Sequence, residues 1–267
     1  MKKQMTIPLF LPEAACPHRC VFCNQHSITN RQEQPTDEQI TETITSYLKT
    51  RRPSIERVEV GFFGGNFTGL PEADMRRVLK LVQPWILSGE VHAIRVSTRP
   101  GYIDERRLTL LKEMNVETIE LGVQSFRDRV LLASGRGHTA TDTERASAMI
   151  LKNGFRLGHQ LMVGLPAEEP GDEIFNAQES VRQGASDIRI YPVLVLRDTE
   201  LEVLCITGKY RPLTLEEAVE KASRMINILE VAGKNIIKVG LHPSESFAKG
   251  DLIAGPWHPN FRELTEK

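Results

Sequence analysis

The stretch VEVGFFGG, residues 58–65, predicts the fold class, because an alternating apolar run leads directly into a glycine turn. An amphipathic helix is expected after it over residues 71–87, followed by a second strand over residues 93–98. Two strands joined by such a helix lie parallel, because a parallel pair needs a long crossover connection. The stretch therefore predicts a βαβ unit of an α/β protein.

The same alternation extends along the chain in both directions. Further strands are expected over residues 5–11, 118–123, 155–163, 187–196 and 236–239, and further helices over residues 35–48, 103–114, 172–183 and 214–232. Six such units predict a partial (β/α)6 TIM-like barrel with a C-terminal tail of about residues 240–267. Because no linker interrupts the pattern, residues 1–267 are expected to form a single domain.

The composition narrows the classes of function. The 267 residues include 34 Lys and Arg against 35 Asp and Glu, for a formal net charge of -1. That balance argues against a wholly basic protein that wraps nucleic acid. No apolar run approaches the ~18 residues of a membrane-spanning helix, and the N-terminus lacks the features of a secretory signal. We therefore expect no membrane partner and a cytoplasmic location.

Three of the four cysteines lie in one loop, residues 16–23, directly after the first expected strand. Cys16, Cys20 and Cys23 are soft thiolate ligands that suit zinc or an iron–sulfur cluster. A zinc site would need a fourth ligand, which His18 or His26 would provide. A four-iron cluster with three protein ligands would instead keep one iron open for a substrate or cofactor. The fourth cysteine, Cys205, lies in an apolar run and is expected to be a small buried side chain.

The spacing Cys-x3-Cys-x2-Cys, with an aromatic residue before the last cysteine, resembles the signature of the radical S-adenosylmethionine (SAM) superfamily. The resemblance covers nearly the whole chain. It is closest to the branch that contains the catalytic subunit of the elongator complex and the oxygen-independent coproporphyrinogen oxidases. The segments that carry it are FFGGNFT (62–68), STRP (97–100), ELGVQS (120–125), RGHT (136–139) and QLMVGLP (160–166). STRP and RGHT favour the elongator-like side.

The resemblance implies a [4Fe-4S] cluster held by Cys16, Cys20 and Cys23, with SAM chelated at the open iron. Reductive cleavage of SAM then gives a 5'-deoxyadenosyl radical, and the protein's task is binding, orientation and exclusion of water. Glycines let the backbone approach the methionyl amine, and a guanidinium fork suits its carboxylate. The positions matched to SAM contacts are Gly64, Gly65, Asn66, Ser97, Gln124, Arg136, Gln160 and Val193. No catalytic residue is assigned.

The elongator-like branch modifies wobble uridines in tRNA with acetyl-coenzyme A, so the resemblance implies a tRNA or related nucleotide substrate. An external flavodoxin- or ferredoxin-like electron donor is expected from the family. The 267 residues accommodate the radical core without an acetyltransferase domain. Two alternatives remain open: a radical SAM enzyme of small-molecule or porphyrin-like metabolism, and a non-catalytic, zinc-stabilised barrel that binds nucleic acid.

Two further polar side chains fall on expected strands. Glu120 needs a partner if it is buried, so it is either a member of an ion pair or a substrate contact. His159 is expected to be an interior histidine with its hydrogen bonds satisfied.

Overall fold

The computed structural model describes residues 4–11, 15–16, 20–24, 33–241 and 244–266. Strands and helices alternate along most of the chain, as the sequence predicts. The elements are β1 (Gln4–Phe10), α2 (Asp37–Lys49), β2 (Arg57–Phe63), η1 (Phe67–Gly69), α3 (Glu72–Leu87), β3 (Ala93–Thr98), η2 (Pro100–Tyr102), α4 (Glu105–Glu113), β4 (Val116–Gln124), α5 (Asp128–Ala133), α6 (Ala140–Lys152), β5 (Arg156–Val163), α7 (Asp172–Arg182), β6 (Asp187–Pro192), β7 (Val195–Leu196), α8 (Glu200–Ile206), α9 (Leu215–Val231), β8 (Asn235–Val239), η3 (Phe247–Asp251), β9 (Leu252–Ala254) and α10 (Phe261–Thr265).

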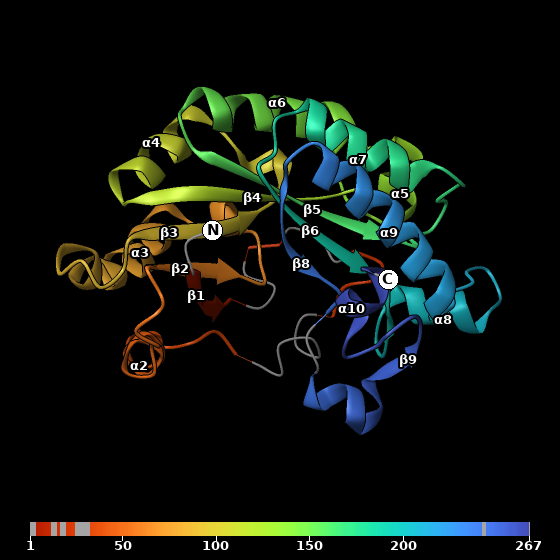
Figure 1. Ribbon diagram of the computed structural model, residues 1–267, viewed down its shortest axis with the longest axis horizontal. Helices are drawn as coiled ribbons and strands as arrows, with labels where there is room; N and C mark the ends of the chain where they lie inside the picture. Colours follow the sequence, from red (N-terminus) through yellow and green to blue (C-terminus); the bar gives the residue numbers. More distant parts are fainter. Residues whose placement is uncertain (1–3, 12–14, 17–19, 25–32, 242–243, 267) are drawn as a thin grey trace.

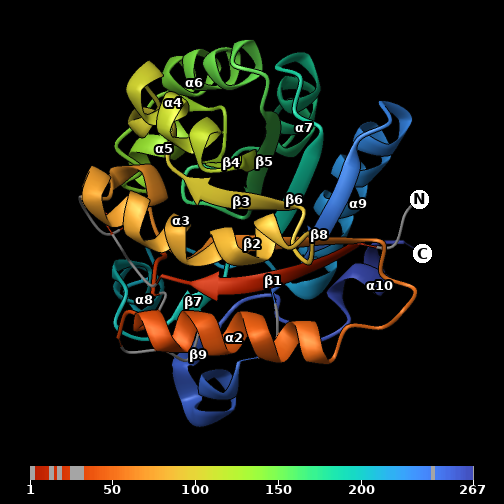
Figure 2. The same ribbon diagram turned by 90° about the vertical axis from the view of Figure 1, so that its left-hand side faces the viewer.

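Seven strands form one parallel sheet in the order β1-β2-β3-β4-β5-β6-β8. The sheet curls into a half-barrel, with α3, α4, α6, α7 and α9 along its outer side (Figure 1). Figure 2 shows α2 lying alongside the edge strand β1. The predicted partial TIM-like barrel is confirmed, and its last expected strand is β8 at the opposite edge of the sheet.

Side chains alternate between the two faces of the sheet along the strands, and this alternation separates the hydrophobic core from the interior of the half-barrel. On β3, Ile94 and Val96 belong to the core beneath the outer helices, whereas Arg95 and Ser97 line an internal cavity. The barrel-facing positions of the other strands are also largely polar and include Glu120, Gln124, Gln160, Arg189, Tyr191 and Lys238. The core therefore lies between sheet and helices, and the inside of the curve is left for a site.

The expected strand over residues 187–196 is divided in two. β6 ends at Pro192, whose nitrogen cannot donate to a sheet ladder. The chain then turns, and β7 pairs antiparallel with β9 in a small second sheet. Trp257 packs edge-on against Phe247, with 6.1 Å between ring centroids, so the tail is attached to this sheet by an apolar cluster.

Local signals in the sequence set the helix ends. Thr36, Thr139 and Thr214 each form a capping box that satisfies exposed amides at the start of α2, α6 and α9. Over the part of the chain that the structure describes, each helix is too short or too polar to cross a lipid bilayer.

Candidate active site

A cavity of about 2030 Å³ lies inside the half-barrel. Most of the predicted site residues line it, although they come from positions far apart in the sequence: Cys16, Cys20, Cys23, Gly64, Gly65, Ser97, Gln124, Arg136 and Gln160. The other two, Asn66 and Val193, are fully buried beside it. Parallel strands bring these residues together because their carboxyl ends meet at one end of the sheet.

The described part of the cysteine loop is held by main-chain hydrogen bonds. The Cys23 amide donates to the Cys20 carbonyl at 2.9 Å and closes a turn between the two thiols. The Val21 amide donates to the carbonyl of Ser134 at the end of α5, and the Val21 carbonyl accepts from a main-chain amide of α8. Cys20 is buried, and Cys16 and Cys23 are half-buried. Residues 20–23 are thus held in place, and Cys16, Cys20 and Cys23 all lie on the cavity wall.

The proposed fourth ligands of a zinc site, His18 and His26, lie outside the described residues. Within the residues that are described, no three His, Cys, Asp or Glu side chains already converge as a metal site. Three cysteines in one loop are the ligand type that an iron–sulfur cluster takes. The chemistry of this donor set therefore fits the cluster that the sequence motif implies.

Two buried guanidinium groups face the middle cysteine. Arg136 Nη1 donates to Cys20 Sγ at 3.1 Å, and Arg99 Nη1 donates to the same sulfur at 3.6 Å. Burial lowers the pKa of Arg136, and the charge of Cys20 partly offsets that effect. Because two buried cations are costly without nearby anions, this corner of the cavity favours thiolate or carboxylate groups.

Several buried polar atoms around Arg136 have no hydrogen-bond partner among the described residues. They are Arg136 Nε, Gln124 Oε1 and both ring nitrogens of His138. Burial, together with the charges of Arg136 and Arg99, lowers the pKa of His138 to about 3, so its ring is neutral. Buried polar groups are normally paired, so the unpaired atoms of Arg136 and Gln124, which line the cavity, indicate a polar ligand.

At this corner the backbone conformation would also let a ligand approach the main chain closely. Gln124 has φ +66°, an uncommon conformation for a residue other than glycine. A Cβ on Gly122 would lie 3.2 Å from both Arg136 Nη2 and Gln124 Nε2. Gly64 has φ +96° and lines the cavity with Gly65, which leaves main-chain groups accessible there.

The side chain of Asn66 is engaged within the protein. Its Oδ1 accepts from Thr98 Oγ1 at 2.8 Å and from the Arg99 amide at 3.2 Å, while its Nδ2 donates to the Ala15 carbonyl. It therefore ties the start of the cysteine loop to the end of β3. Val193 donates its amide to the Val163 carbonyl and packs in an apolar cluster.

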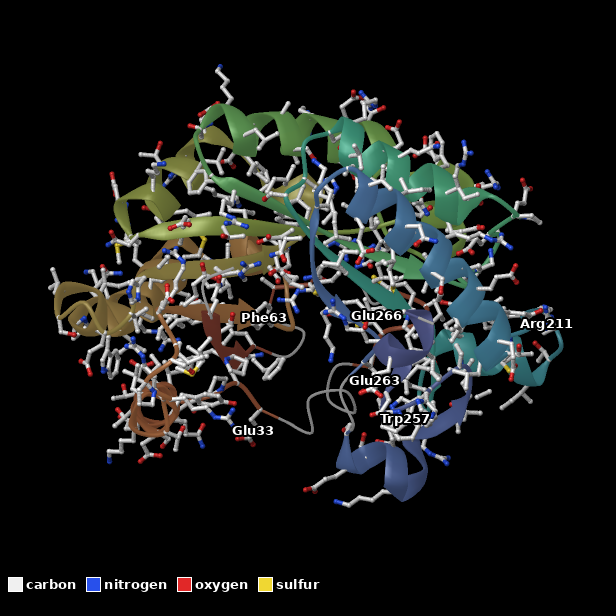
Figure 3. The ribbon with its side chains drawn as sticks, in the orientation of Figure 1. Glu33, Phe63, Arg211, Trp257, Glu263 and Glu266 are labelled. Carbon is white, nitrogen blue, oxygen red and sulfur yellow. The ribbon has the colours of Figure 1, made fainter. Side chains whose placement is uncertain are left out.

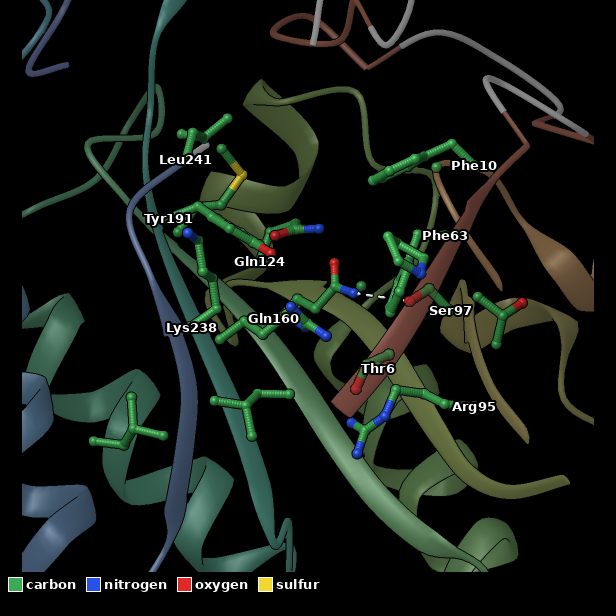
Figure 4. A pocket seen from close by; sticks show the side chains of 18 of the residues that line it. Thr6, Phe10, Phe63, Arg95, Ser97, Gln124, Gln160, Tyr191, Lys238 and Leu241 are labelled. Atoms are coloured by element: carbon green, nitrogen blue, oxygen red, sulfur yellow. Dashed lines mark hydrogen bonds between the residues drawn. The ribbon is translucent and has the colours of Figure 1, made fainter. Parts of the chain in front are cut away.

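Gln160 presents its side-chain oxygen to the cavity, because both hydrogens of its amide nitrogen are already donated to other side chains. Gln160 Nε2 donates to Ser97 Oγ at 3.1 Å (Figure 4). It also donates to Glu120 Oε2 at 3.1 Å. An ionised carboxylate only accepts hydrogen bonds, so Glu120 fixes which end of the amide faces it. The amide oxygen is thereby available to a hydroxyl donor in the cavity.

Glu120 belongs to a buried network of charges. Its carboxylate accepts from Arg95 at 2.6 Å and from two nitrogens of Arg189 at 2.6 and 3.0 Å. Burial alone would raise the pKa of Glu120, but the charges and hydrogen bonds of Arg189 and Arg95 outweigh it and lower the pKa to about 2. Glu59 and Asp187 also pair with Arg95. The sequence left open whether Glu120 is a member of an ion pair or a substrate contact, and the structure places it in an ion-pair network.

The two remaining candidates lie outside the cavity wall. His159 is buried between Ser147 Oγ and Ser180 Oγ, each 3.1 Å from a ring nitrogen. Burial, with a smaller effect of Lys234, lowers its pKa to about 3, so it is the satisfied interior histidine that was expected. Cys205 lies on α8 and packs partly buried in an apolar cluster.

Sequence reasoning did not identify part of the cavity wall. That part is formed by Phe10, Phe63, Arg95, Arg189 and Lys238. A signal was present, because charged residues alternate with apolar ones on strands expected to be buried on both faces. Such residues need partners inside the barrel, although the pattern alone does not say which.

A family model described as the radical SAM superfamily matches residues 12–176, and one described as the radical SAM C-terminal domain matches residues 186–267. The chain is 26% identical over 257 residues to a tRNA uridine(34) acetyltransferase of Methanocaldococcus infernus, covering 81% of this chain and 48% of that protein. It is 26% identical over 243 residues to the heme chaperone HemW of Bacillus subtilis, covering 85% of this chain and 62% of that protein.

Among solved structures, the archaeal Methanocaldococcus infernus Elp3 with an N-terminal deletion matches the fold with a TM-score of 0.76. The two chains are 20% identical, and the match covers 100% of this chain and 62% of the other. This likeness shows the fold alone. The chain spans about half the length, or less, of the first curated relatives it matches.

Proposed function

The chain belongs to the radical SAM superfamily, and from that premise we propose that it modifies tRNA at the wobble uridine or a related nucleotide. It is a radical SAM enzyme, and its cofactors are a [4Fe-4S] cluster and SAM. The observation that carries the proposal is the similarity, over 81% of this chain, to a tRNA uridine(34) acetyltransferase. Because the chain spans 48% of that protein, the proposal concerns the radical chemistry and not acetyl transfer.

Cys16, Cys20 and Cys23 would hold the cluster, and its open iron would bind SAM. When bound, the cluster supplies the electron for reductive cleavage of SAM to a 5'-deoxyadenosyl radical. A flavodoxin- or ferredoxin-like protein would donate that electron. The unpaired buried groups at Arg136 and Gln124 support the presence of a polar ligand beside the cysteines.

The protein's own residues would bind and orient SAM. Arg136 would direct its fork to the carboxylate, and Gly64 and Gly65 would let their main chain approach the amine. The outward oxygen of Gln160 suits a ribose hydroxyl, since a hydroxyl can donate to it. Gln124 and Ser97 would complete these contacts, while Asn66 and Val193 would act through the loop and strand ends that they hold.

A second candidate function is radical SAM chemistry on a small or porphyrin-like molecule. It is favoured by the similarity to the heme chaperone HemW over 85% of this chain. Membership of the superfamily favours either enzyme over a non-catalytic, zinc-stabilised barrel.

The deciding experiment compares tRNA nucleosides by mass spectrometry in a deletion strain, in the complemented strain and in a strain that carries Cys20→Ala. The proposal expects one modified nucleoside to disappear on deletion, to return with the native chain and to stay absent with Cys20→Ala. Identical nucleoside profiles in all strains would rule out the tRNA substrate. In the same proteins, release of 5'-deoxyadenosine after anaerobic reconstitution reports the radical chemistry separately.

A further inference from the structure

Tyr191 is a polar side chain of the cavity wall to which the proposed SAM contacts give no role. It lies on β6 two residues after Arg189, so both side chains point into the half-barrel, and both line the cavity. Figure 4 shows Tyr191 projecting from β6 into the cavity. Burial raises the pKa of Tyr191 and outweighs the opposing effect of the Arg189 charge. The phenol is therefore protonated and has a hydrogen to donate.

The Arg189 guanidinium is already engaged and also holds the oxygen of Tyr191. Two of its nitrogens donate to Glu120 at 2.6 and 3.0 Å, and its carbon lies 5.0 Å from the centroid of the Phe63 ring. The partner that the described residues give to the Tyr191 hydroxyl is Arg189, through a hydrogen bond. A guanidinium only donates hydrogen bonds, so the phenol oxygen accepts and the phenol hydrogen is left for an acceptor in the cavity. This part of the wall thus offers a neutral donor with a fixed position.

The side chains on either side of this donor are mainly apolar. Met162 of β5 is the direct cross-strand neighbour of Tyr191 and also lines the cavity. Phe63 of β2 lies on the inner side of the curved sheet, with Phe10 of β1 at 6.2 Å between ring centroids (Figure 3). A Cβ on Gly61 would lie 2.5 Å from the Phe63 ring, so this glycine makes room for the ring inside the barrel. One polar donor between apolar walls suits a flat, largely apolar group with a single well-placed acceptor.

We propose that the Tyr191 hydroxyl donates a hydrogen bond to a carbonyl oxygen of the substrate and so orients a flat ring between Met162 and Phe63. This inference rests on the proposed function, because it concerns the substrate that shares the cavity with SAM. A neutral carbonyl fits better than an anion, since the guanidinium of Arg189 is already paired with Glu120. A pyrimidine base such as uracil has both the flat ring and the carbonyl oxygens. Arg189 is then a positioning residue, which acts through Tyr191.

The test measures dissociation constants by calorimetry on the cluster-reconstituted protein with SAM bound. One arm compares uridine with 2-thiouridine and 4-thiouridine, because sulfur is a weaker acceptor than oxygen in nearly the same shape. A second arm compares 2-pyridone with 2-thiopyridone, which are flat rings but not nucleosides. The native protein should bind the oxygen member of at least one pair about two- to tenfold more tightly than the sulfur member.

Two tyrosine variants separate the proposed contact from a general effect on the cavity. Tyr191→Phe removes only the hydroxyl, so it should abolish the preference for oxygen and leave the Kd for SAM unchanged. Tyr47→Phe is the matched control, because Tyr47 of α2 also lines the cavity, and it should keep the native preference.

Replacement of Tyr191 by 3-fluorotyrosine covers the case in which Tyr191→Phe does not fold. Fluorine makes the phenol more acidic and hence a stronger donor, so the preference for oxygen should increase. The inference is overturned by equal affinity or no binding in both arms, by a preference that Tyr191→Phe retains, or by a rise in the Kd for SAM in that variant. A preference for 2-pyridone without binding of any nucleoside would keep the inference but contradict the tRNA proposal, so the two failures are distinguishable.

Discussion

Glu120→Gln tests whether the buried network positions a cofactor contact. The substitution keeps the size of the side chain but replaces an acceptor with an amide, which has two donor hydrogens. Arg95, Arg189 and Gln160 all donate to Glu120, so the new amide must meet one of them donor to donor. Gln160 is the only one of these partners that can accept instead, which requires its amide to turn over. Its oxygen would then leave the cavity.

The structure sets the magnitude of the two expected effects. Removing one charge of a buried pair costs about 3–5 kcal/mol of the free energy of unfolding. Turning the Gln160 oxygen away would remove the proposed neutral hydrogen bond to SAM, which is worth about 0.5–1.5 kcal/mol, or a two- to tenfold rise in the Kd of SAM. In a Gln160→Ala background the oxygen is already absent. There, Glu120→Gln should leave the Kd for SAM unchanged.

The assay is calorimetric titration of SAM into the four proteins of this double-mutant cycle, with urea unfolding of each. Glu59→Gln is the matched control, because Glu59 is buried and pairs with Arg95 but does not contact Gln160. It should lower stability without changing the affinity for SAM. The positioning role is refuted if Glu59→Gln weakens SAM binding as much as Glu120→Gln does, or if Glu120→Gln acts equally in both backgrounds.

Three further predictions concern the cluster, pH and the fourth cysteine. Arg99→Gln removes a cation from the Cys20 sulfur, so the midpoint potential of the reconstituted cluster should fall in an EPR-monitored redox titration, and Arg99→Lys should restore most of it. Because the pKa of Glu120 is lowered to about 2, its contribution to stability is complete above its unfolded pKa of about 4.5 and is lost as the pH falls toward 2. Urea unfolding should therefore show a smaller acid loss for Glu120→Gln than for the native chain, and an equal loss would contradict this assignment. Cys205→Ser should keep the native iron content after reconstitution, whereas Cys20→Ala should lose it, as measured by iron analysis.

The part of the site around the cysteines could be predicted, because short sequence motifs contain its residues. The cysteine loop, the glycine turn at Gly64 and the Gln124–Arg136 segment are each contiguous or close in sequence, and each follows a strand end. Parallel strands then bring those ends together without any further information. The predicted residues that line the cavity follow from this rule, whereas the part that Asn66 plays depends on a contact with the end of β3 that the motif does not reveal.

The part of the cavity wall formed by Phe10, Phe63, Arg95, Arg189 and Lys238 could not be predicted, since these are single residues on five different strands. Glu120 was identified as needing a partner, but its partners Arg95 and Arg189 are 25 and 69 residues away. Which charges meet depends on the strand register, and irregularities in the β3–β4 and β6–β8 pairings shift that register by a residue. A one-residue slip turns a side chain to the opposite face of the sheet.

The polar interior and the open form of the sheet depend on each other. A closed barrel of eight strands has an interior just wide enough for side chains to fill, and bulky apolar layers usually fill it. Here seven strands curl with β1 and β8 at the two edges, and a cavity of about 2030 Å³ remains inside. Inward residues such as Arg189 and Lys238 would lose solvation in a closed barrel without gaining apolar contacts. The same alternation that puts polar residues inside therefore favours a half-barrel, whose interior can admit a polar cofactor.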